Sequence, residues 1–75
     1  MKLEKGKKYI VNLGYKYNNS LVLAEYREEV WIEDEIFVGY SVKPIKIIKD
    51  RLDGFAEHTI GCNMCVDMDQ IKEVK

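Results

Sequence analysis

Cysteine and proline are scarce in this sequence. Two of its 75 residues are cysteine and one is proline. At most one internal disulfide can form, so a multi-disulfide scaffold is excluded. A chain this short buries only about 60% of its unfolded surface and is marginally stable on its own. We expect a single small domain over residues 1–75, one that gains stability from pairing with a second copy as a dimer.

Long apolar runs are also missing. No stretch approaches the roughly 18 apolar residues that a membrane helix needs. The charged start, residues 1–5, lacks the apolar segment of a signal peptide. We expect a soluble, cytoplasmic protein with reduced thiols and no membrane partner.

The sequence has few groups that could do chemistry. It has one histidine and no phosphate-binding glycine motif. His58 follows Glu57, and a general base also needs a nucleophile and an orienting group within reach. No such set is evident, so we expect no catalytic residue, no cofactor and no enzyme activity.

Apolar residues recur at period two, the pattern of strands that are buried on one face. Loops are expected at 14–20, with Asn18-Asn19 at a turn, at the acidic hairpin tip 33–35, and at Asp53-Gly54. The inward positions expected up to the proline are Tyr9, Val11, Leu13, Val22, Ala24, Tyr26, Ile36, Val38, Tyr40 and Val42.

The second half of the chain continues this pattern. Pro44 cannot donate to a strand ladder, so we expect it at a strand end or an edge, before a short edge strand over 45–49. An extended segment is expected over 55–60, a short helical turn at Asp67–Gln70, and a last strand at Ile71–Val74. The fold class is therefore all-β, a small SH3-like barrel of five or six strands.

The order of these segments resembles that of the PemK/MazF-like toxins, SH3-like barrels that cleave RNA as dimers. The similar segments are "KGKKYIVNLG", "NSLVLAE", "IFVGYSV" and, most closely, "CVDMDQIKEV". The resemblance implies an endoribonuclease or its inactive descendant. The family's arginine before the second strand is absent, because Asn19-Ser20 stands there, whereas Ser41 can match the hydroxyl partner. Without that arginine, no cation would stabilise the negative charge of the transition state.

A histidine and two cysteines lie close together in "HTIGCNMC". His58, Cys62 and Cys65 supply three ligands, one fewer than a structural zinc site usually takes. Period-two alternation predicts a strand instead, with Cys62 buried and Cys65 on the opposite face. We therefore expect no metal, unless a bulge at Asn63-Met64 turns the chain or a second copy lends ligands.

Charge is unevenly distributed along a chain of net charge −1. Acidic and aromatic residues gather at the expected hairpin, and aromatic side chains are favoured anchors at protein interfaces. Trp31 can also be read as the core aromatic of the hairpin. Tyr15 and Tyr17 lie in the first loop beside Lys16. The predicted partner-binding residues are Glu28, Glu29, Trp31, Glu33, Asp34, Glu35, Tyr15 and Tyr17.

These patterns favour a non-enzymatic binding protein. We expect it to bind a macromolecular partner, a protein in the first instance, through the acidic aromatic hairpin or a strand edge. Its small size suits an accessory or inhibitor encoded by a phage or mobile element. Nucleic-acid binding is an alternative, and its candidate residues are Lys43, Lys46, Lys49 and Arg51.

Overall fold

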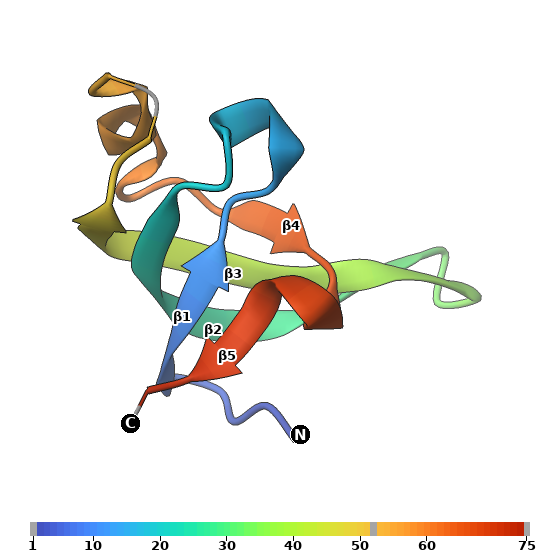
Figure 1. Ribbon diagram of the computed structural model, residues 1–75. Coiled ribbons are helices and arrows are strands. Elements are labelled where there is room, and N and C mark those ends of the chain that lie inside the picture. The colour runs from blue at the N-terminus through green and yellow to red at the C-terminus, as the bar shows by residue number, and fades with distance from the viewer. Residues whose placement is uncertain (1, 52, 75) are drawn as a thin grey trace.

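The computed structural model describes residues 2–51 and 53–74 (Figure 1). Five strands and three short 3-10 turns make up the described chain. In order they are β1 (Lys8–Asn12), η1 (Tyr15–Tyr17), β2 (Leu21–Ile32), β3 (Ile36–Lys49), η2 (Phe55–Thr59), β4 (Met64–Val66), η3 (Met68–Gln70) and β5 (Ile71–Glu73). Within these residues, no helix is long and apolar enough to cross a membrane.

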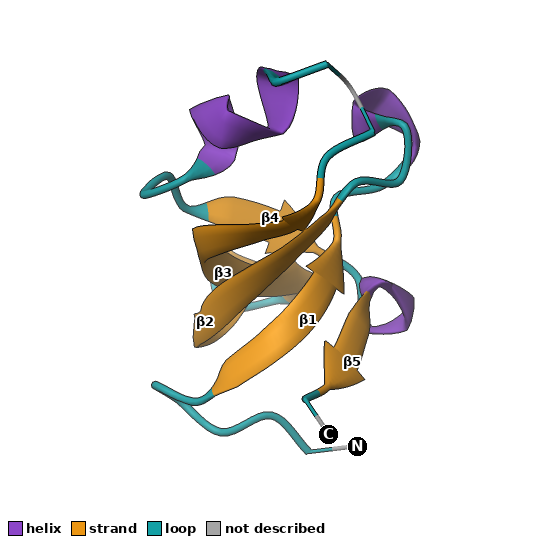
Figure 2. Cartoon of the chain, turned by 60° about the vertical axis from the view of Figure 1, so that its left-hand side comes forward, coloured by secondary structure: helices purple, strands orange, loops and turns teal. Residues whose placement is uncertain are grey.

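All five strands belong to one antiparallel sheet in the order β4-β3-β2-β1-β5. Figure 2 shows how strongly this sheet curves, with the 3-10 turns outside it. The all-β class is confirmed, and so are the small SH3-like arrangement and the short helical turn that precedes the last strand. The strand count is five.

The core follows the predicted alternation in the first half of the chain. Inward residues of β1 and β2 are buried, and Val42 of β3 packs with them. The buried apolar cluster consists of Tyr9, Val11, Leu13, Val22, Ala24, Tyr26, Val42, Ala56, Val66 and Ile71. These side chains lie between two halves of one bent sheet, so a short chain encloses them without a second layer.

Ile36 and Val38 depart from the predicted core face and are exposed. The pairing of β2 with β3 shifts register between Val30 and Trp31, and again between Tyr26 and Glu28. Each such irregularity adds a residue to one strand, so the period of two is broken there. Side chains before and after an irregularity therefore cannot be assigned to one face by simple alternation.

Pro44 is not at a strand end but does lie on an edge of the sheet, the second of the two predicted places, because among the described residues β4 pairs with β3 only at residues 40–42. It is fully buried within β3, opposite Ala24, where the register shifts again. A proline fits there because the ladder is interrupted at that point. Its carbonyl accepts a 2.8 Å hydrogen bond from the Gly61 N–H. The predicted edge strand over 45–49 is consequently the second half of β3.

The segment after the Asp53-Gly54 turn is wound and not extended. Asp53 and Gly54 both have positive φ, which confirms the turn, and the chain then forms η2. The Thr59 hydroxyl is buried and donates to the Ala56 carbonyl at 2.7 Å. This local hydrogen bond gives the backbone an alternative to strand pairing.

A capping box sets the start of β5. Asp67 caps η3, and the Gln70 side-chain oxygen accepts the Asp67 N–H at 2.9 Å. The Gln70 amide also donates to the Asn12 carbonyl at 2.9 Å. One side chain thus links the turn before β5 to the end of β1, the strand that β5 pairs with.

Candidate functional site

The far end of the ribbon formed by β2 and β3 extends beyond the rest of the sheet (Figure 1). On one side, the chain before β1 pairs with β2 only as far as Tyr26. On the other, β4 pairs only with residues 40–42. Residues 30–39, which we call the arm, therefore form a two-stranded ribbon with both edges unpaired. Such a ribbon is at best marginally stable in water.

Four aromatic rings run from the core out along one face of the arm. Tyr26 is buried, and its ring centroid lies 6.1 Å from that of Tyr40. Phe37 contacts Tyr40 edge to face at 5.1 Å, and Trp31 contacts Phe37 edge to face at 5.3 Å. Edge-to-face pairs are favourable because the ring edge is positive and the ring face negative. We call Trp31, Phe37 and Tyr40 the aromatic face.

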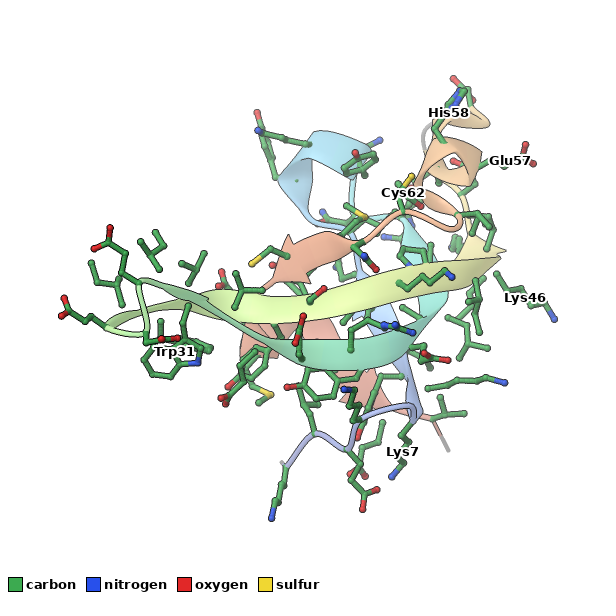
Figure 3. The ribbon with its side chains drawn as sticks, turned by 180° about the vertical axis from the view of Figure 1, so that it is seen from behind. Lys7, Trp31, Lys46, Glu57, His58 and Cys62 are labelled. Atoms are coloured by element: carbon green, nitrogen blue, oxygen red, sulfur yellow. The ribbon has the colours of Figure 1, made fainter. Side chains whose placement is uncertain are left out.

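The aromatic face remains open to solvent at its outer end. Trp31 is 46% exposed and Phe37 is 42% exposed. Figure 3 shows Trp31 at the tip of the molecule, away from the core. Its indole N–H donates to the Glu29 carboxylate at 3.3 Å. The alternative that Trp31 is the core aromatic of the hairpin is therefore wrong, because its ring lies outside the buried cluster and is half-exposed.

The opposite side of the arm is aliphatic. Ile32 pairs with Ile36 across the hairpin, one step from the Trp31–Phe37 pair. Successive residues of a strand point to opposite faces, so these isoleucines face away from the aromatic face. Ile32 is 53% exposed and Ile36 is 61% exposed. Large apolar side chains are thus exposed on both sides of the arm.

The tip of the arm is a tight acidic turn. Glu33 and Asp34 both have positive φ, and the Glu35 N–H donates to the Ile32 carbonyl at 3.0 Å. This geometry matches the twist of a hairpin but usually selects asparagine or glycine. Ion pairs of the described residues join Lys7 to Glu4 and Arg27 to Glu25. Neither involves a carboxylate of the tip.

The pKa of the Tyr26 phenol is raised by burial and by the acidic residues nearby. Burial raises the pKa of its phenol above 10.0, and the negative charges of Glu29 and Glu28 raise it further. The phenol is therefore held in its neutral form at the point where the arm leaves the core.

Tyr15 and Tyr17 lie away from the arm, in η1 (Figure 1). Tyr15 is 93% exposed, whereas Tyr17 packs against the core. The structure thus does not bring the two tyrosines together with Trp31. Between η1, β4 and η3 lies an open hollow of about 550 Å³. Its lining includes Leu13, Tyr15, Tyr17, Met64, Asp67 and Gln70.

Cys62 is exposed, which corrects the prediction that it is buried. The chain turns at Gly61, whose φ is 82°, and β4 begins only at Met64. The Cys62 thiol lies 3.7 Å from the His58 carbonyl (Figure 3). Cys65 is exposed as predicted and lies on β4, opposite Ser41. Over residues 2–51 and 53–74, no three His, Cys, Asp or Glu side chains gather as a metal site would require.

Ser20, where the resemblance implied an arginine, has a structural role. Its hydroxyl is fully buried, donates to the Tyr17 carbonyl at 2.8 Å and accepts the Arg51 N–H at 2.8 Å. Asn19 has a positive φ and forms the turn before it, as predicted. This pair of residues closes the β1–β2 loop against the end of β3.

The exposed phenylalanine and isoleucines of the arm were missed by the sequence reasoning, which placed position 36 inside. The available signal was length, because the apolar runs on both sides of the acidic tip are longer than the neighbouring strands that could cover them.

Comparison with protein-family models, with curated proteins and with solved structures finds no match for this chain.

Proposed function

We propose that this chain is a non-enzymatic binding protein that docks a partner protein on the aromatic face of its arm. The observation that carries the proposal is the series of rings from buried Tyr26 to half-exposed Trp31. A rigid base and an open end are what an interface anchor needs, because little side-chain entropy is lost on binding.

The partner is expected to be basic around an apolar cleft. Five carboxylates lie next to the arm or at its tip: Glu28, Glu29, Glu33, Asp34 and Glu35. Positive charge on a partner would speed its encounter with such a surface, whereas nucleic acid would be repelled. An accessory or inhibitor that occupies the basic groove of another protein fits this description.

The test is capture of a partner from the source cell with the full chain as bait. We expect a specific basic protein to be retained by the unaltered chain, and to be lost with Trp31→Ala. Tyr15→Ala is the matched control, because Tyr15 is also an exposed aromatic but lies away from the arm. Capture that survives Trp31→Ala, or no specific capture, would contradict the proposal.

A further inference from the structure

The ribbon of β2 and β3 has a second face that the proposed function leaves unused. Cross-strand pairs define this outer face, which is opposite the core and the aromatic face. From the tip to the base, its pairs are Ile32 with Ile36, Val30 with Gly39, Glu28 with Ser41, Glu25 with Lys43, Leu23 with Lys46, and Leu21 with Lys49. None of these residues belongs to the buried apolar cluster, but Gly39 is buried, because Cys65 and Val66 of β4 lie against it.

The two ends of the outer face carry opposite charge. The tip ends in three carboxylates, whereas the base carries Lys43, Lys46 and Lys49, with Asp50 and Arg51 just beyond β3. Figure 3 shows Trp31 and Lys46 at opposite ends of the ribbon. The charges cannot meet within one molecule, because the ribbon separates them. They can meet between two molecules that run in opposite directions.

Apolar side chains are exposed at both ends as well. Ile32 and Ile36 are exposed near the tip, and Ile45 and Ile48 are exposed near the base. Leu23, beside Lys46, is half-buried. Each end of the ribbon therefore offers apolar area together with an excess of one sign of charge.

We propose that a second copy of this chain packs antiparallel on the outer face, about a two-fold axis near Glu28 and Lys43. Each acidic arm then lies over the basic base of its partner, and Ile32 and Ile36 of each copy are covered. A two-fold contact is closed, because the same patch serves both molecules. The parallel arrangement would bring two acidic tips together and is disfavoured by repulsion.

This dimer and the partner proposed above share the acidic tip but use different apolar side chains, so Trp31→Ala tests the partner and Lys46→Glu/Lys49→Glu tests the dimer. Trp31 and Phe37 point away from the outer face, so two aromatic faces stay open in the dimer. Loss of one interaction would leave the other measurable.

The test is the mass of the purified chain by sedimentation equilibrium over a series of concentrations and salt levels. We expect a dimer that weakens as salt rises, because exposed charge pairs are screened. The double variant Lys46→Glu/Lys49→Glu, or Glu33→Lys/Glu35→Lys, should raise the dissociation constant by roughly tenfold or more. Combining all four substitutions should restore the dimer, since the opposite signs then face each other again.

Two further variants make the result specific. Ile36→Lys should give a monomer, and Trp31→Ala should leave the dimer intact. The far-ultraviolet circular dichroism of each variant shows whether it is folded. The charge-swap variants change exposed side chains only, so they still test the dimer if Ile36→Lys unfolds.

A chain that is monomeric at every concentration in low salt would overturn the proposal. So would a failure of the combined swap to restore the dimer, or growth into long polymers, which indicates head-to-tail contacts. The proposal also fails if Lys46→Glu/Lys49→Glu leaves the mass unchanged but abolishes retention on single-stranded nucleic acid, because the basic end would then serve that ligand.

Discussion

The rings of Trp31 and Phe37 meet edge to face, 5.3 Å between centroids, on the two strands of an arm that no third strand covers. The contact links the tip of the arm to Tyr40 and, through it, to the core. An aromatic pair at such a place is more valuable to an interface than to the fold, because about half of each ring stays in water.

Replacing Trp31 should therefore cost little stability. Trp31→Ala is expected to lower the free energy of unfolding by about 1 kcal/mol, since an edge-to-face pair and a half-buried ring are lost. Val42→Ala, at a fully buried position, should cost about 2–3 kcal/mol. Urea denaturation of both variants measures the difference. An equal loss for the two would mean that the arm is part of the cooperative core.

Gly39 should not tolerate a side chain. A Cβ there would lie 2.8 Å from the Cys65 sulfur and 2.9 Å from the Val66 carbonyl oxygen. We expect Gly39→Ala to destabilise the protein by about 1–3 kcal/mol, because β4 must move away from β3. Gly39→Ala/Cys65→Ala should recover only part of that loss, since the Val66 carbonyl belongs to the backbone. Denaturation of the two variants and of Cys65→Ala alone checks this, and full recovery would contradict it.

Tyr26 should make the fold sensitive to alkali. Its pKa is raised above 10.0 in the folded chain, mainly by burial, so the native state holds this proton more tightly than the unfolded state does. The stability that results is complete below pH 10.0 and decreases as the pH rises through the folded pKa. The ultraviolet absorbance of phenolate should show one tyrosine that ionises late and is missing in Tyr26→Phe. A titration unchanged in that variant would refute the assignment.

Both thiols should react in the native protein. Cys62 and Cys65 are exposed, on the turn before β4 and on β4 itself. A thiol reagent should add twice under native conditions, as judged by intact mass, and at rates close to those in denaturant. A single addition would instead support the prediction from alternation that Cys62 is buried. Stoichiometric zinc in the purified chain would contradict the placement of both residues.

The local pattern of apolar and turn residues was sufficient to predict much of the fold. The alternation of Tyr9 with Val11, and of Val22 with Ala24, predicted a half-buried strand in each case, because side chains of a strand point to alternate faces. The asparagines of the first loop and the Asp53-Gly54 pair predicted turns, because these residues tolerate positive φ.

Prediction from the sequence failed where one extra residue changes which face of the strand the following side chains occupy. The irregularities of β3 carried Ile36 and Val38 out of the expected core and allowed Pro44 to lie within a strand and not at its end. A β-bulge depends on the fit of two strands that are distant along the chain, so neither strand encodes it alone. Cys62 was misplaced for a similar reason, since Gly61 turns the chain before β4 can begin.

The sequence alone determined an all-β domain with an acidic, aromatic hairpin, because periodicity, turn residues and charge are local properties. Only the tertiary structure decided that the hairpin extends past its neighbours, with rings on one side and isoleucines on the other. Exposure depends on which strands end first, and that is set by the pairing of segments that lie far apart in the sequence.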